Sequence, residues 1–408
     1  MHAEMEKYYA RNKFYLSRIG SWPYQHKVLK ILLPCILIMV QFSFMATVIL
    51  VLHDTWGDVD LAVESVITII PIVGSNTKLF NIVVYNDKFR HLLQLMNDHW
   101  NAFSNKSDRC VLKYYAEIGQ KVTKYYTAYC CTMVVLYLFI PLTPKILDIV
   151  RPLNESRPLK FICEVEYRVD KEKYYYPILM HVSLTTVITV GIILAIDTIY
   201  IICVLHACSL FTAISHRLKK IMGQINVKTN NNEKMRTRTH NHLLERYDAI
   251  NDNCDDYREL IICLKKHQLA LEYAQILNST FTKATFVLLF LNVLIMSIIG
   301  LQVINKLGNT EEVVRYMTIA VGALTHLVCM CFPGQLLIDK STEVFDKAYS
   351  SRWYTFSIKS RQLLKILLYR SLVPCTLSAG KMFIMSMTMF TTVMQTAMSY
   401  FTALGSIK

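Results

Sequence analysis

The sequence predicts an all-α protein, a bundle of seven transmembrane helices with a cytosolic N-terminus and an extracellular C-terminus. Three observations predict this fold class. The 408 residues are 53% hydrophobic and 18% charged, with a mean hydropathy of +0.31, which is typical of polytopic membrane proteins and not of soluble enzymes. Seven apolar runs are long enough to cross a bilayer. Lysine and arginine gather in alternate connecting segments, as topology signals do.

The first span is predicted at 28–52, after a segment, 1–27, that carries five basic residues. This first apolar run is too long for the core of a signal peptide, so we expect segment 1–27 to stay cytosolic. Pro34 lies in the first turns of the span, where its missing N–H is tolerated. The second span, 61–85, contains Pro71, which favours a kink.

Two charged side chains interrupt the second span. Glu64 lies near one end and Lys78 lies deeper. A charge in hydrocarbon is costly, and long side chains can reach the membrane surface instead. We therefore expect both side chains to snorkel, in preference to a direct functional role.

The third span is predicted at 125–147, after a polar connector with helical character at 87–124. The loop that follows, 148–175, contains the triplet Asn154-Glu155-Ser156. This triplet is an acceptor pattern for N-glycosylation if the loop faces outward. Asn154 is therefore a candidate glycosylation site.

The fourth span, 176–209, is longer than a bilayer requires. Asp197 lies about 30 Å along it from Pro177 at helical rise, so the helix should project beyond the membrane with Asp197 near the inner boundary. We expect Asp197 to accept structural hydrogen bonds and not to relay protons.

The segment 206–282 is polar, and its second half has apolar residues at four-three spacing. This pattern predicts a cytosolic helix that packs against its neighbours and leads into the fifth span, 281–304. The sixth span is predicted at 313–338. The segment 339–378 then includes a basic amphipathic helix.

The last span, 382–407, holds no ionisable side chain and reaches about 39 Å as a helix. Small polar residues recur three or four positions apart along one side of it: Thr388, Thr391, Gln395, Ser399, Thr402 and Ser406. One interpretation is helix packing within one bundle. The other is a water-lined path, which needs several chains to place this helix around a common axis.

The basic residues decide the orientation. With a cytosolic N-terminus, the four inside segments hold thirty lysines and arginines, and the outside segments hold eight. The net charge of +14 is thus spread over topology signals and forms no patch for nucleic acid.

The sequence carries no motif for catalysis, so the chain is predicted not to be an enzyme. Phosphate-loop, metalloprotease, serine-elbow and dinucleotide patterns are absent from the 408 residues. His326, Cys329 and Cys331 fit no standard zinc spacing and are interpreted as packing residues. Neither a metal nor a cofactor is predicted.

The final third resembles insect odorant receptors. The residues that carry the resemblance are Cys331-Phe332-Pro333-Gly334-Gln335, Asp339-Lys340-Ser341, Ala348-Tyr349, Trp353, Ser378-Ala379-Gly380-Lys381 and Ser399-Tyr400-Phe401-Thr402, with Asp197, His206, Cys208, Phe211 and Arg217-Leu218 upstream. The resemblance is most specific over about the last seventy-five residues and weak in the first half.

This resemblance implies an odorant-gated, nonselective cation channel in the cell membrane of an olfactory neuron's dendrite. A tuning subunit would assemble with a coreceptor subunit into a tetramer, with helices 4–7 extended into a cytosolic anchor. The coreceptor's valine, glutamine and leucine at the gate and filter fall on Ala403, Ser406 and Ile407. Because Ala403 and Ser406 are smaller and the coreceptor's cytosolic insertion is missing, the chain is assigned as a tuning subunit. The full set of pore or gate residues is Thr392, Gln395, Thr396, Ser399, Thr402, Ala403, Ser406 and Ile407.

A small volatile odorant is expected in the outer half of the second, third, fourth and sixth spans. Depth and resemblance select the candidate walls Val66, Ile69, Ile70 and Val73; Leu136, Phe139 and Ile140; Met180, Ser183, Leu184 and Val187; and Tyr316, Met317 and Ala320. Lipid and permeant cations are the other expected partners.

Three rival classes remain. A G-protein-coupled receptor would have the opposite orientation, a secondary transporter would show inverted repeats, and a gustatory-type channel subunit usually has a different C-terminal signature. The predicted organisation is 1–27, cytosolic; 28–205, ligand-binding helices 1–4; 206–282, cytosolic; 283–338, helices 5 and 6; 339–378, cytosolic; and 379–408, the pore-lining helix.

Overall fold

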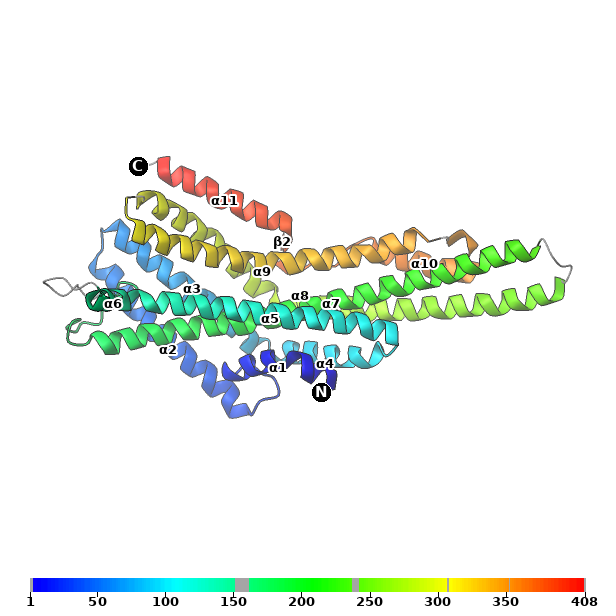
Figure 1. Ribbon diagram of the computed structural model, residues 1–408, viewed down its shortest axis with the longest axis horizontal. Coiled ribbons are helices and arrows are strands. Elements are labelled where there is room, and N and C mark those ends of the chain that lie inside the picture. The colour runs from blue at the N-terminus through cyan, green and yellow to red at the C-terminus, as the bar shows by residue number, and fades with distance from the viewer. Residues whose placement is uncertain (1–2, 151–160, 237–241, 307, 352, 407–408) are drawn as a thin grey trace.

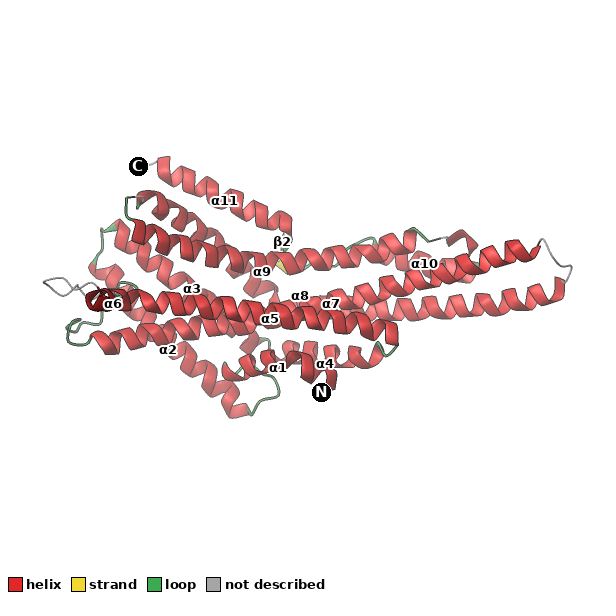
Figure 2. Cartoon of the chain, in the orientation of Figure 1, coloured by secondary structure: helices red, strands yellow, loops and turns green. Residues whose placement is uncertain are grey.

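The computed structural model describes residues 3–150, 161–236, 242–306, 308–351 and 353–406. They are helical almost throughout (Figure 2), which confirms the all-α class. The elements of the first half are α1 (Ala3–Arg18), α2 (Lys27–Asp54), α3 (Val59–Val84), α4 (Asn86–Ala102), α5 (Lys106–Phe139), η1 (Ile140–Leu142) and α6 (Thr143–Val150). Those of the second half are α7 (Tyr175–Arg236), α8 (His242–Asn305), α9 (Thr310–Tyr349), η2 (Trp353–Thr355), α10 (Ile358–Ser371), β1 (Ser378–Ala379), β2 (Phe383–Ile384) and α11 (Met387–Ser406).

Six described helices are long and apolar enough to cross a membrane: α2, α3, α5, α7, α8 and α9. They match the first six predicted spans. The seventh, α11, has 20 residues and no charged side chain. The expected projection of the fourth span is confirmed, because α7 continues for 62 residues, or about 90 Å.

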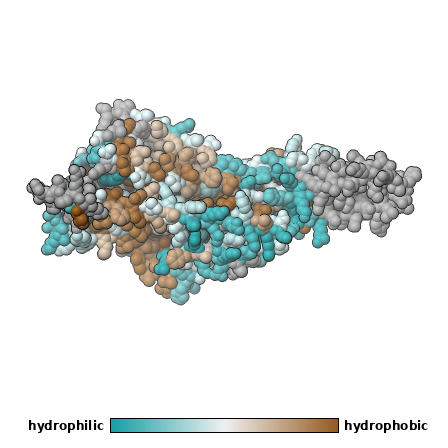
Figure 3. All heavy atoms as spheres, viewed as in Figure 1, coloured by the Kyte–Doolittle hydropathy of each residue, from teal (hydrophilic) through white to brown (hydrophobic). Residues whose placement is uncertain are grey.

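The molecule is elongated and divides into two halves along its length (Figure 1). The apolar half comprises residues 28–84, 125–150, 161–205, 283–338 and 382–406. Exposed apolar side chains gather there, over the left of Figure 3, and hydrophilic side chains cover the middle of the molecule. Examples are Ile31, Met39, Phe80, Met180 and Phe290. A surface of this kind fits lipid, so the apolar half is the part suited to the membrane.

The polar half comprises the remaining described residues. Paired helices α7 and α8 form its spine, and α10 lies beside their extension in Figure 1. Tyr8 of α1 stacks on Trp100 of α4 with ring centroids 6.2 Å apart. Asp108 pairs with both Lys266 and Arg217, which ties α5 to α8 and α7. These contacts bury both charge and aromatic surface, so the polar half has a core of its own.

A buried histidine in the polar half predicts acid sensitivity. His99 lies among Phe103, His206 and Tyr273, with its Nδ1 3.2 Å from Nε2 of His206, and burial lowers the pKa of His99 to about 4. The folded state therefore binds fewer protons than the unfolded state below pH about 6.5, where an ordinary histidine protonates, and stability falls as pH drops toward 4. The expected contribution is at most about 3 kcal/mol.

The measurement is the melting of detergent-solubilised protein between pH 7 and pH 4. His99→Gln should show a smaller loss on acidification than the wild type. His91→Gln, at an exposed position of the same helix, should keep the wild-type loss. An equal loss in wild type and His99→Gln would contradict the assignment.

A short hairpin fixes the start of α11. Strands β1 and β2 pair antiparallel, and Gly380 turns the chain between them with φ of +62°. The Gly380 N–H donates to the Thr282 carbonyl of α8 at 2.9 Å, and a Cβ at this position would lie 2.7 Å from the Phe286 ring. Only glycine fits both the left-handed backbone and the close approach. No pattern in the sequence predicted this hairpin.

Candidate functional site

A cavity of about 340 Å³ lies within the apolar half. Helices α3, α5, α7, α8 and α9 form most of its wall, each presenting residues three or four positions apart. Representative lining residues are Ile67, Ile70, Gly74 and Lys78 of α3; Tyr126, Tyr129, Met133 and Tyr137 of α5; Val182, Thr186, Thr189 and Ile193 of α7; Leu288, Leu291 and Ile295 of α8; and Arg315, Ile319, Gly322 and His326 of α9. A mostly apolar enclosure of this volume suits a small organic molecule.

One end of the cavity is closed by a buried ion pair. The Lys78 ammonium donates to the Asp197 carboxylate and lies 2.8 Å from Nε2 of His326, and the Tyr126 hydroxyl donates to Asp197 at 3.2 Å. The side chain of Lys78 is 2% exposed. We call Lys78, Asp197, His326 and Tyr126 the polar floor. The prediction that Lys78 snorkels is wrong, because a carboxylate on α7 is within reach inside the bundle.

The prediction for Asp197 is confirmed in its structural part. Its carboxylate accepts hydrogen bonds from two helices, α3 through Lys78 and α5 through Tyr126. A charged acceptor buried in the membrane half must be compensated in this way. Asp197 therefore binds the cavity's walls together at the floor.

The other end of the cavity carries a second ion pair. Arg315 of α9 donates to Glu64 of α3, so the snorkelling prediction for Glu64 is also wrong. Arg315 and His326 line the cavity from one helix, eleven residues apart, so the two ends are separated by about 16 Å.

Residues after the third span tuck into the bundle beside the cavity. Ile162, Cys163 and Val165 are buried and pack with Phe44 and Val182, and Cys163 lines the cavity. Cys163 belongs to the loop predicted at 148–175, and no sequence pattern predicted that this loop would contact the cavity. The available signal was the apolar stretch Phe161-Ile162-Cys163 inside an otherwise polar loop.

The predicted ligand-binding residues lie on the expected helices but mostly on other faces. Among the described residues, Ile70 is the one candidate that lines the cavity. The others do not line it: Val66, Ile69, Val73, Ile140, Ser183 and Ala320 are half-buried, Tyr316 is buried, and Leu136, Phe139, Met180, Leu184, Val187 and Met317 are exposed. Choosing residues by depth alone cannot set the rotation of a helix about its axis. Their part in binding stays a prediction.

The predicted pore residues share one face of α11. Thr392, Gln395, Ser399, Thr402 and Ala403 are exposed, and Thr396 is half-buried. The opposite face packs against the bundle through Val393 and Ala397, which are buried. The hydroxyls donate to carbonyls of their own helix, as Ser399 does to Gln395 at 2.9 Å.

Three predicted sites cannot be placed in space. Ile407 and Asn154 lie outside the described residues, and Ser406 ends α11 without a described side chain. The part of the chain that the structure describes contains no cluster of three or more His, Cys, Asp or Glu side chains arranged to hold a metal.

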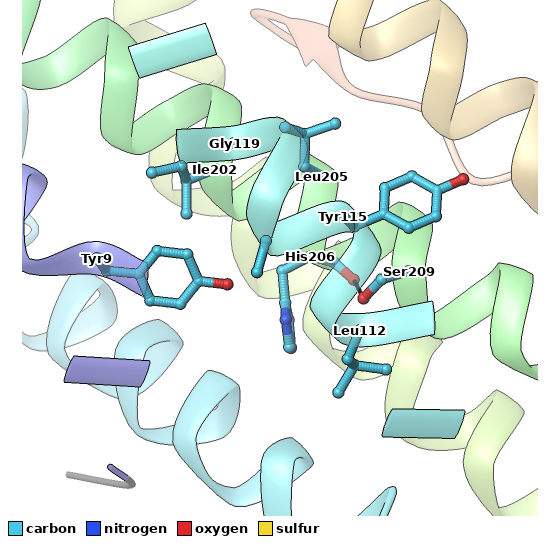
Figure 4. A pocket seen from close by; sticks show the side chains of 9 residues that line it. Tyr9, Leu112, Tyr115, Gly119, Ile202, Leu205, His206 and Ser209 are labelled. Atoms are coloured by element: carbon cyan, nitrogen blue, oxygen red, sulfur yellow. Dashed lines mark hydrogen bonds between the residues drawn. The ribbon is translucent and has the colours of Figure 1, made fainter. Parts of the chain in front are cut away.

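A second hollow lies in the polar half (Figure 4). Tyr9, Tyr115, His206 and Ser209 surround it from α1, α5 and α7. It has no room for a water molecule. This hollow is a packing defect, and the larger cavity is the candidate site.

The family model described as "7tm Odorant receptor" matches residues 58–398. This match covers most of the chain, including every helix around the cavity and most of α11.

The chain belongs to the odorant receptor family.

Similar members include odorant receptor 22c of Drosophila melanogaster, 26% identical over 51% of this chain and 48% of that protein. The odorant receptor coreceptor of Aedes aegypti is 24% identical over 36% of this chain and 30% of that protein. The chain therefore spans less than half the length of these two relatives. Odorant receptor 13a of Drosophila melanogaster is 20% identical over 87% of this chain and 82% of that protein. These relatives are odorant receptors, which confirms the prediction that the chain is not an enzyme.

The fold also matches a solved structure. Olfactory receptor OR5 of the insect Machilis hrabei, in complex with eugenol, aligns with a TM-score of 0.76 at 11% identity, covering 99% of both chains. At this identity the match shows the fold alone. It confirms the seven-helix bundle, and the apolar helices together with the family make the chain a multi-pass membrane protein.

Proposed function

We propose that this odorant receptor is the odorant-binding tuning subunit of a heteromeric, ligand-gated, nonselective cation channel. The observation that carries the proposal is the cavity of about 340 Å³ in the apolar half of an odorant receptor. Its wall is mostly apolar, so dispersion and the hydrophobic effect would hold a small volatile molecule. The ligand opens the channel only if it binds the open state more tightly than the closed state.

The exposed polar face of α11 supports assembly around a pore. The exposed Gln395 side-chain amide would face lipid in a single chain, and hydrocarbon disfavours a polar group that lacks a partner. Several copies of this helix around one axis would place the face on water. We propose a tetramer with the coreceptor subunit, in which permeant cations pass this face.

The charge distribution supports the orientation. Thirty basic residues in the inside segments against eight outside favour a cytosolic N-terminus and an extracellular C-terminus. We place the chain in the dendrite membrane of an olfactory sensory neuron, with Asn154 on the outer side.

The test is whole-cell current on application of an odorant panel, with the chain expressed alone and with the coreceptor, under G-protein blockade. A rapid cation current that needs the coreceptor and survives blockade is expected. Current abolished by blockade would overturn the channel and favour a G-protein-coupled receptor.

Filling the cavity gives a second test. Ile70→Trp adds a large ring to the cavity wall, so the concentration for half-maximal response should rise at least about tenfold while surface expression persists. Ile31→Trp is the matched control, because Ile31 is 69% exposed and does not line the cavity. Unchanged responses in Ile70→Trp would remove the cavity as the odorant site.

A further inference from the structure

The threonines on the cavity wall already have hydrogen-bond partners. The hydroxyls of Thr185 and Thr186 donate to the His181 and Val182 carbonyls of their own helix at 2.9 and 3.0 Å. Thr189 accepts from Nε2 of Gln41 at 3.0 Å. A threonine hydroxyl that donates to its own backbone has no hydrogen left to donate to a ligand, although its oxygen can still accept. These hydroxyls make the wall less polar than the sequence indicates.

The charged groups on the wall are engaged as well. Lys78 is held by Asp197 and His326, and Arg315 by Glu64. Recruiting Lys78 would break a buried ion pair and recruiting Arg315 would break a partly buried one, and both losses are unfavourable inside the bundle. The charged ends therefore close the cavity and do not select for ionic ligands.

Tyr129 differs from these groups. Among the described residues that line the cavity, it is the one with a buried side-chain polar atom, its hydroxyl oxygen, that has no hydrogen-bond partner. A buried hydroxyl left unpaired destabilises the protein, so a partner brought by a ligand would recover that free energy.

The position of Tyr129 sets how a ligand lies. Tyr129 stands one helical turn along α5 from Tyr126, whose hydroxyl donates to Asp197, and the two rings stack with centroids 6.4 Å apart. Tyr129 is thus next to the polar floor. From there the wall toward Tyr137 and Cys163 is mainly apolar.

We infer that the Tyr129 hydroxyl hydrogen-bonds the ligand, and that the ligands of this receptor are small hydrocarbons carrying one oxygen function. The oxygen of a ketone, ester or alcohol lies at Tyr129, and the hydrocarbon part extends toward Cys163. This inference rests on the proposed function, because it assigns the ligand's chemical class at the same cavity.

The test compares Tyr129→Phe with wild type on matched probes, an alkane and the ketone and alcohol of the same chain length of about seven to ten carbons. Removing one hydroxyl keeps the ring and its packing. The preference for the oxygenated probe over the alkane should fall about tenfold in Tyr129→Phe, as expected for one lost hydrogen bond in a buried site. Tyr125→Phe, on the same helix and 69% exposed, should keep the wild-type preference.

Ligand-dependent melting of the detergent-solubilised full chain reads binding without channel opening. Stabilisation by the ketone should exceed that by the alkane in wild type and Tyr125→Phe, and the difference should shrink in Tyr129→Phe. Equal stabilisation by ketone and alkane in wild type, or an unchanged difference in Tyr129→Phe, would overturn the inference. If Ile70→Trp abolishes ligand stabilisation while Tyr129→Phe has no effect, the cavity remains the ligand site and only the assignment to Tyr129 is wrong. If Ile70→Trp leaves ligand stabilisation unchanged, the proposed odorant site itself is wrong.

Discussion

Replacing Lys78 by methionine should lower the free energy of unfolding by about 3–5 kcal/mol, because it leaves the Asp197 carboxylate buried without its cation. The pair lies in the apolar half, where a buried charge without a partner is costly. The polar floor is built from side chains of α3, α5, α7 and α9. Loss of the ion pair should therefore weaken the packing of all four helices at the floor, and its effect should exceed the loss of one contact. The measurement is the melting temperature of detergent-solubilised protein together with surface expression.

The second substitution Asp197→Asn tests whether the unpaired charge is the cause. Asparagine keeps the shape and can still accept from the Tyr126 hydroxyl, so Lys78→Met with Asp197→Asn should recover most of the lost stability. The matched control is Lys13→Met, whose pair with Glu6 at 3.1 Å is on the surface; its loss should cost well under about 1 kcal/mol. A double variant as unstable as Lys78→Met alone would mean that the floor needs the ion pair itself.

The helices could be predicted because their signal is local. Apolar runs of bilayer length and the basic residues between them located six of the spans, and an uncharged run located α11. The polar stripe of α11 followed from helical periodicity, and the structure leaves that face exposed through residues such as Gln395 and Ser399.

The site could not be predicted in the same detail, because it is formed by contacts between helices that lie far apart in the sequence. The sequence predicts that the Lys78 side chain reaches the membrane surface, because nothing in its own helix shows that Asp197, 119 residues away, lies beside it. Ile70 lines the cavity and Val73 does not, although both lie at suitable depth; the rotation of α3 depends on what packs behind it. Cys163 reaches the cavity through a loop fold that no periodic pattern encodes.

The contact between α9 and the start of α11 gives the second large prediction. A Cβ at Gly334 would lie 2.2 Å from the Met385 carbonyl oxygen, which is backbone and cannot rotate away. The side-chain oxygen of the next residue, Gln335, accepts from the Met387 N–H at 3.2 Å. This hydrogen bond fixes the position of the start of α11 along α9. Gly334→Ala should force them apart and cost at least about 1–3 kcal/mol, as overpacking does.

The functional effect of Gly334→Ala should exceed its effect on folding. Residue 334 lies on the same helix as His326 of the cavity floor, so α9 connects the cavity to the backbone contact at the start of α11. A displaced junction should therefore reduce odorant-evoked current more than surface expression, measured on the same cells. Gly191→Ala is the matched control, because a Cβ there meets nothing within 4 Å, and alanine should be neutral or slightly stabilising in that helix. Normal currents and a normal melting temperature in Gly334→Ala would show that α11 is free to shift on α9, and that ligand binding must reach the pore helix through α8 and the hairpin instead.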